Sequence, residues 1–148
     1  MDKIRIKQVK LGKGSARIIG DAAAAYEPEL GVKRFERHFV LANSKQFEIR
    51  DYLETAQPQT FTLLLHADKT IQPAGKNRFV INTPGADLSL NLRLPGSAAT
   101  KIEPNYLIGP GRPGSVDRGE RQQRGERLAI TTAETATQAR FVVVLKIH

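Results

Sequence analysis

Hydrophobic residues alternate with polar residues along most of this chain, with a period of two. The segment 86–95, ADLSLNLRLP, shows the pattern most clearly, because its four leucines at alternate positions face one side of an extended strand. This alternation predicts strands that bury one face and leave the other in water. The predicted strands are residues 3–7, 15–20, 34–41, 47–54, 60–67, 78–82, 86–95, 126–132 and 139–147.

Turn signals separate these strands and helical signals are weak. Clusters of Pro, Gly and Asn lie at residues 57–59, 73–77, 83–86 and 95–97. The alanine-rich segment 21–30 favours helix, but Pro28 limits it to about one turn. The uninterrupted apolar run 141–145 predicts a strand that is covered on both faces. We therefore predict an all-β fold, an antiparallel two-sheet β-sandwich that is jelly-roll-like and contains little helix.

A predicted hairpin at residues 34–54 carries one cation and one anion on its apolar face. An antiparallel register that places Leu41 opposite Phe47 also places Arg37 opposite Asp51. An isolated buried charge costs several kcal/mol, whereas a hydrogen-bonded pair is tolerated. We interpret Arg37 and Asp51 as a structural pair that fixes the register, so Asp51→Ala should cost about 3–5 kcal/mol. The alternative is that Asp51 is a catalytic or metal-binding carboxylate.

The opposite face of the same hairpin is mostly polar. It carries Arg34, Glu36, His38 and Val40 on the first strand, and Glu48, Arg50, Tyr52 and Glu54 on the second. This composition predicts a solvated face with cross-strand pairs.

The length of 148 residues suits a single sandwich domain that spans residues 1–148. The net charge is +8, and residues 1–20 hold six basic residues against Asp2, a net +5. Lys3, Arg5 and Lys7 share one face of the first strand, and we predict that they bind a polyanion. Nucleic acid, anionic lipid and acidic polysaccharide are all candidate partners. The alternative is a basic, solvated surface that has no dedicated partner.

Residues 109–127 differ from the rest and predict a long Arg/Gly-rich loop. Repeated Arg-Gly steps suggest RNA binding. However, three carboxylates against five arginines leave a net charge of only +2, and the segment has no aromatic residue to stack on a base. We therefore do not expect nucleic acid as a partner.

No motif for catalysis, metal or cofactor binding stands out. The absence of Cys excludes disulfides and thiolate chemistry. The three histidines, His38, His66 and His148, do not have the spacing of a metal site. GxSxG, GxxxxGK[ST] and a helix-opening GxGxxG are all absent. No apolar run approaches the roughly 20 residues of a membrane helix, and the N-terminus lacks the apolar region of a signal peptide. We predict no catalytic residue, metal ligand, cofactor or membrane partner in this chain.

The order of several short motifs resembles the C-terminal β-sandwich region of heparinase II/III-like polysaccharide lyases. These motifs are GDAAAAY at 20–26, RHFVL at 37–41, FEIRDYLE at 47–54, TFTLLLH at 60–66, LRLP at 92–95, IGPGRPG at 108–114 and FVVVLKI at 141–147. The resemblance covers most of residues 15–148. It assigns a framework role to Gly20, Asp21, Tyr26, Arg37, Asp51 and His66.

This resemblance implies a function through a larger protein. Members of the family cleave uronate-containing polysaccharides, including glycosaminoglycans, by β-elimination, at the junction of a helical toroid and the sandwich. The toroid supplies the catalytic residues, and a His-x-His and a His-Asn motif upstream of the matched region supply a metal site; this chain has neither motif. The resemblance thus implies a non-catalytic C-terminal domain whose partner is the missing N-terminal toroid, in a periplasmic or secreted parent. The alternative is a stand-alone module that binds acidic polysaccharide or another polyanion.

Overall fold

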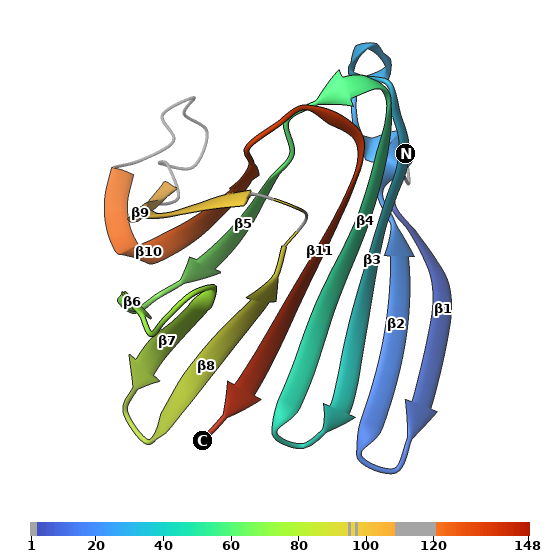
Figure 1. Cartoon of the computed structure of the whole chain (residues 1–148). Helices are drawn as coiled ribbons and strands as arrows, with labels where there is room; N and C mark the ends of the chain where they lie inside the picture. Colours follow the sequence, from blue (N-terminus) through green and yellow to red (C-terminus); the bar gives the residue numbers. More distant parts are fainter. Residues whose placement is uncertain (1–2, 95, 97, 109–120) are drawn as a thin grey trace, which may run out of the picture.

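The computed structural model describes residues 3–94, 96, 98–108 and 121–148, and strands dominate this part of the chain (Figure 1). The strands are β1 (Arg5–Gly12), β2 (Ser15–Asp21), β3 (Val32–Asn43), β4 (Gln46–Gln59), β5 (Thr62–Ala67), β6 (Ile71–Pro73), β7 (Arg78–Thr83), β8 (Ala86–Arg93), β9 (Ala98–Ile108), β10 (Arg121–Thr132) and β11 (Ala136–Ile147). Two short 3₁₀ turns, η1 (Ala23–Ala25) and η2 (Pro28–Leu30), lie between β2 and β3. Within the described residues, no helix is long and apolar enough to cross a membrane.

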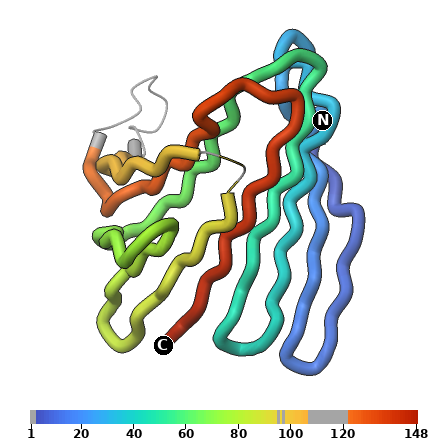
Figure 2. Tube along the Cα trace, viewed as in Figure 1, coloured from blue at the N-terminus to red at the C-terminus, as the bar shows by residue number. Residues whose placement is uncertain are grey.

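The strands form two antiparallel sheets of unequal width. The large sheet has eight strands in the order β1-β2-β3-β4-β11-β8-β7-β6, and the small sheet has three in the order β5-β10-β9. The chain leaves the large sheet after β4 and returns to it as β6, and it crosses again between β8 and β9 and between β10 and β11 (Figure 2). The predicted all-β sandwich of two antiparallel sheets is confirmed.

The hydrophobic core lies where the two sheets face each other. The small sheet contributes Leu63, Leu128 and Ile130, and the large sheet contributes Phe79, Ile81, Leu90, Leu92, Phe141 and Val143. Strand β11 lies in the middle of the large sheet, and residues 141–144 are buried on both of its faces. The prediction from the apolar run at this position is confirmed.

Each of the nine predicted strands is present. The structure also has two strands that the sequence analysis did not predict, β6 and β9. Strand β6 has only three residues, too few to show an alternation. Strand β9 includes Pro104, which removes a backbone donor and usually argues against a strand interior. It lies at the edge of the small sheet, where the missing N–H is tolerated.

The predicted loop at 109–127 is wrong for its last part, because residues 121–127 lie in β10; residues 109–120 lie outside the described residues. The pairing of β10 with β9 shifts between Gln123 and Glu126, which marks a β-bulge. Gly125 in this bulge has φ +66°, and a Cβ there would lie 2.1 Å from the carbonyl oxygen of Ala67. The glycine is therefore a bulge residue that only glycine can occupy.

The hairpin of β3 and β4 has the predicted register, with Arg37 opposite Asp51 and Leu41 opposite Phe47. The Nε and Nη2 atoms of Arg37 donate to Oδ1 and Oδ2 of Asp51, each at 2.7 Å. The side chain of Asp51 is only 2% exposed, whereas that of Arg37 is 35% exposed. The bond is a bidentate, charge-assisted contact that satisfies a buried carboxylate.

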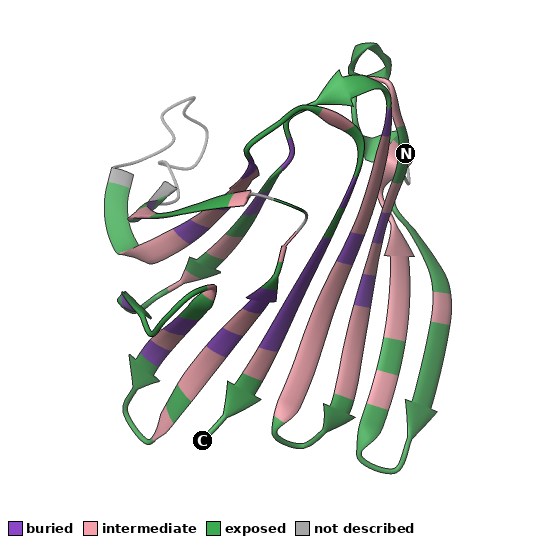
Figure 3. Cartoon of the chain, viewed as in Figure 1, coloured by how far each residue is buried: buried purple, intermediate pink, exposed green. Residues whose placement is uncertain are grey.

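The small sheet covers only part of the large one. Opposite residues in neighbouring strands share a face, so one row of the core-side face runs through Val9, Ile18, Phe39, Ile49, Val143 and Leu92. Val143 and Leu92 are buried, Ile18, Phe39 and Ile49 are intermediate, and Val9 is 55% exposed. Figure 3 shows the same decrease in burial from β11 towards β1. The apolar face of β1 is therefore uncovered in this chain.

The two partners of the buried ion pair should respond unequally to truncation. Arg37→Ala leaves the carboxylate of Asp51 buried without a partner, and we expect a loss of about 3–5 kcal/mol. Asp51→Ala leaves a guanidinium that is 35% exposed and still contacts solvent, so the loss expected from the sequence is revised downward, to about 2–3 kcal/mol. Urea denaturation of both variants measures these values. Full stability of either variant would contradict a role for the pair in fixing the hairpin.

Candidate functional site

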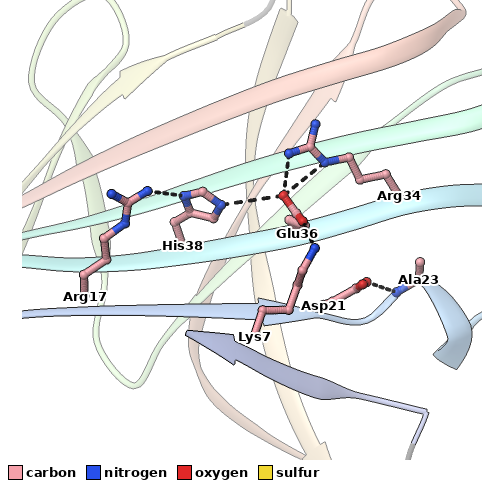
Figure 4. A network of polar contacts seen from close by, with 7 residues as sticks. All are labelled: Lys7, Arg17, Asp21, Ala23, Arg34, Glu36 and His38. Atoms are coloured by element: carbon pink, nitrogen blue, oxygen red, sulfur yellow. Dashed lines mark hydrogen bonds and ion pairs between the residues drawn. The ribbon is translucent and has the colours of Figure 1, made fainter. Parts of the chain in front are cut away.

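A polar network lies on the outer face of the large sheet, across β1, β2 and β3 (Figure 4). At its centre is Glu36, whose side chain is only 11% exposed. The carboxylate accepts hydrogen bonds from Lys7 Nζ on β1 and from Arg34 on β3, whose Nε lies 3.1 Å from Oε2. The ammonium of Lys7, followed by the guanidinium of Arg34, lowers the pKa of Glu36 from 4.5 to about 2.

A bulge in β1 brings Lys7 into this network. The register of β1 on β2 shifts between Ile6 and Gln8, so Lys7 is the extra residue. Its side chain reaches over β2 to Glu36 on β3. The residue of β2 directly opposite Glu36 is Asp21, a like charge, which destabilises the pair of strands unless cations offset it. Lys7 and Arg34 provide these cations.

His38 extends the network along β3. Arg17 Nη2 lies 3.5 Å from Nδ1 of His38, and a guanidinium only donates, so Nδ1 accepts and Nε2 carries the proton of the neutral ring. Nε2 lies 3.8 Å from Glu36 Oε2 and has no hydrogen-bond partner among the described residues. Burial of the ring, followed by the charge of Arg17, lowers the pKa of His38.

The prediction of a solvated outer face with cross-strand pairs is wrong about solvation at Glu36 and His38. Glu36 and His38 are buried, because the long side chains of β1 and β2 and the ring of Tyr52 lie against them. Cross-strand contacts are present, as His38 and Arg34 each contact the ring of Tyr52, whereas the ion pairs of this hairpin run along each strand, as Arg34 with Glu36 and Arg50 with Glu48. Sequence alternation alone could not show this, since a face is polar whether or not longer side chains cover it.

The three residues predicted to bind a polyanion fall into two groups. Lys3 and Arg5 are exposed, and Arg5 lies opposite Asp21 on the outer face. Lys7 shares this face but its ammonium is bonded to Glu36. The structure thus assigns Lys7 a structural contact, and polyanion binding by the three residues stays a prediction.

The other candidate residues have structural partners. The Arg37–Asp51 pair lies on the core side, away from the network. Nδ1 of His66 donates to Oδ1 of Asn105 at 2.8 Å, and His148 Nε2 lies 2.9 Å from Ser89 Oγ. Among the described residues, no group of three or more His, Asp or Glu side chains is placed to hold a metal ion.

The network is better suited to holding strands together than to catalysis. A general acid or base must come within hydrogen-bond reach of the substrate. Glu36 and His38 form an acid–base pair in this network, but each has only 11% of its side chain exposed, and the carboxylate of Glu36 already accepts hydrogen bonds from Lys7 and Arg34. An ionised Glu36 beside a neutral His38 therefore anchors β1 and β2 onto β3.

Comparison with solved structures finds the same fold in larger proteins. The chain is similar to heparinase III, the BT4657 gene product, with a TM-score of 0.70 and 14% identity over 98% of this chain and 21% of that one. It is similar to heparan sulfate lyase HepC from Pedobacter heparinus, with a TM-score of 0.73 and 14% identity over 98% and 22%. A further heparinase III structure has a TM-score of 0.72 and 10% identity over 97% and 21%.

These matches show that the fold of the chain is that of one domain of heparinase III and heparan sulfate lyase. The chain spans about a fifth of the length of these structures. No family model matches the sequence, and no curated protein matches it. The resemblance inferred from the order of short motifs is confirmed at the level of the fold.

The network should make stability depend on pH in two windows. Because the pKa of Glu36 is lowered in the folded state, its stabilising effect is present above pH 4.5 and is lost as the pH falls towards about 2. The pKa of His38 is also lowered, so its protonation favours the unfolded chain and stability decreases as the pH falls below about 6.5. We expect Glu36→Gln to lower the free energy of unfolding at pH 7 by roughly 1–2 kcal/mol, since its partners are half-exposed.

Urea denaturation between pH 7 and pH 2 tests this expectation. The wild-type and Glu36→Gln curves should converge as the pH falls below 4.5. Glu103→Gln is the matched control, because Glu103 also pairs with two cations, Lys101 and Arg127, but is more exposed than Glu36, at 23% against 11% of the side chain; its effect should be smaller. Parallel curves for wild type and Glu36→Gln over the whole range would contradict the role of this carboxylate.

Proposed function

We propose that this chain is a non-catalytic sandwich domain, C-terminal in a heparinase II/III-like polysaccharide lyase. The parent protein would cleave a uronate-containing polysaccharide by β-elimination. The observation that carries the proposal is the structural match, which covers 97–98% of this chain but only 21–22% of the heparinase III and heparan sulfate lyase chains. A complete domain of such an enzyme, without the rest of it, accounts for both figures.

The uncovered apolar face of β1 supports this proposal. Ile6, Val9 and Leu11 lie on the core side of the large sheet, yet they are 55–78% exposed. Apolar patches of this kind mark surfaces that pack on another protein part. We propose that the remainder of the parent, which the sequence resemblance describes as a helical toroid, covers this face.

The chemistry of β-elimination also supports a role outside catalysis. The reaction needs a base that removes the proton next to the uronate carboxylate, and an acid that protonates the leaving oxygen. The acid–base pair closest to this description, Glu36 and His38, is covered by neighbouring side chains and its carboxylate is held by two cations. The catalytic groups would then belong to the rest of the parent protein.

The second candidate is a stand-alone module that binds acidic polysaccharide. The net charge of +8 and the exposed positions of Lys3 and Arg5 favour it. The uncovered apolar face of β1 argues for the first candidate, since an isolated soluble module gains nothing from it.

An elimination assay separates the two candidates. We expect the chain alone to produce no ultraviolet absorbance of unsaturated uronate from heparan sulfate, heparin or chondroitin sulfate. The protein encoded by the complete gene should produce it from at least one of them. Activity of the isolated chain would contradict the non-catalytic role. A gene that encodes only this chain would favour the second candidate.

The apolar face gives a sharper test of the domain interface. In the isolated chain, Ile6→Ser with Val9→Ser should change stability by less than about 0.5 kcal/mol per site, because both side chains are already exposed. In the complete protein the same pair should cost roughly 2 kcal/mol or more. Leu64→Ser is the matched control, since Leu64 is 41% exposed on the small sheet, and its effect should be equal in both. Equal, small effects of the double substitution in both proteins would contradict the interface.

A further inference from the structure

Three arginines from neighbouring strands line one hollow on the outer face of the large sheet. Arg50 lies on β4, Arg140 on β11 and Arg93 on β8, and the hollow has a volume of about 490 Å³. Val142 and Leu94 complete its lining, and Val142 is buried. No carboxylate lines this hollow.

The strand register brings the three arginines together. Val142 is directly opposite Arg50 on one side and Arg93 on the other, so these two arginines lie two strand spacings apart, about 10 Å between Cα atoms. Arg140 precedes Val142 by two residues and therefore projects from the same face. The short apolar side chain of Val142 leaves the space between the longer guanidinium groups open.

Two of the three cations have no ion-pair partner in the part of the chain that the structure describes. Arg50 is bonded to Glu48, with 2.7 Å between Nε and Oε2. Arg93 and Arg140 form no ion pair with any described residue, although both are exposed. Some cations of this face are neutralised, as Arg34 and Lys7 are by Glu36, whereas others, such as Arg5 and Lys10, are exposed. The hollow differs from these single exposed cations because it gathers three guanidinium groups around one open space.

Guanidinium groups bind carboxylate and sulfate through two parallel hydrogen bonds, which a lysine ammonium cannot form. Cations spaced over about 10 Å suit a polymer that carries several anionic groups better than one small anion. The geometry thus favours an extended polyanion that crosses β4, β11 and β8.

A second, adjoining hollow distinguishes polysaccharide from nucleic acid. It has a volume of about 360 Å³, shares Arg140 with the first, and is lined also by Arg34, Tyr52, Glu54 and Gln138. The carboxylate of Glu54 accepts hydrogen bonds from sugar hydroxyls but repels phosphate and sulfate, so this hollow suits an uncharged part of a sugar better than a nucleotide, which carries a phosphate at every unit. The ring of Tyr52 is already in contact with the guanidinium groups of Arg34 at 5.2 Å and Arg140 at 5.1 Å, so it is a poor platform for a nucleobase.

We propose that Arg50, Arg93 and Arg140 form a binding site for the sulfate and carboxylate groups of an acidic polysaccharide. The adjoining hollow binds the hydroxyl groups of the next sugar. The choice of polysaccharide as the ligand class rests on the proposed function. The site lies on the outer face, and thus on the opposite side of the sheet from the apolar surface of β1.

Calorimetric titration of the chain with a sulfated heparin hexasaccharide tests this site. We expect Arg93→Ala and Arg140→Ala each to weaken binding, that is, to raise the dissociation constant about 5- to 10-fold. Arg93→Lys keeps the charge but cannot donate two parallel hydrogen bonds to one anionic group. It should therefore raise the dissociation constant by less than Arg93→Ala does. The control is Arg124→Ala, which removes the same charge from the small sheet, and it should change affinity less than twofold. Urea denaturation of each variant shows whether its fold is intact. The result for Arg93 is easier to interpret, because Arg140 also contacts the ring of Tyr52 and its loss can affect stability.

Two outcomes would overturn the proposal. Equal weakening by Arg124→Ala and Arg93→Ala would show that net charge alone governs binding. Equal affinity for a single-stranded DNA of matched charge, with the same dependence on Arg93, would assign the site to nucleic acid. The titration involves no turnover, so its result is independent of whether the complete protein proves to be a lyase.

Discussion

The bidentate contact between Arg37 and Asp51 constrains the centre of the large sheet. Asp51 is 2% exposed on a largely apolar face, and Arg37 on the adjacent strand donates a hydrogen bond to each of its oxygens. A shift of one residue between β3 and β4 would separate the two charges and turn the apolar residues of one strand to the other face. Strand β11 pairs with β4 in turn, and Phe141, opposite Asp51, is 1% exposed in the core. The alignment of β3, β4 and β11 therefore depends on one charged pair.

The unequal width of the two sheets gives the molecule two different surfaces. On the core side, burial decreases from β11 to β1, and the last strand presents apolar side chains to solvent. On the outer side, arginine and glutamate side chains cover buried residues such as Val142 and His38. One face is thus suited to contact with protein and the other to contact with polar, charged ligands.

Local alternation was sufficient to predict the fold class, nine strands and the register of the central hairpin, because period-two patterns report which residues share a face. It missed β9, where Pro104 and charged residues obscure the pattern, and it assigned the bulge at Gly125 to a loop. The site was harder to predict. Glu36 and His38 appeared solvent-facing, since nothing in β3 itself shows that Lys7 and Arg17 lie over them. Arg93 lies 43 residues after Arg50 and 47 residues before Arg140 in the sequence. The strand order β4-β11-β8 brings the three together.

The bulge at Lys7 has a consequence for how the chain behaves among copies of itself. Strand β1 is an edge of the large sheet, with one row of backbone N–H and C=O groups that no strand of this chain pairs within the described residues. A regular apolar edge of this kind recruits strands from other molecules and leads to aggregation. The extra residue interrupts the regular spacing of that row, and the exposed charges of Arg5 and Lys10 repel an identical strand. The apolar surface beside this edge can therefore stay open for a side-chain contact while strand addition is disfavoured.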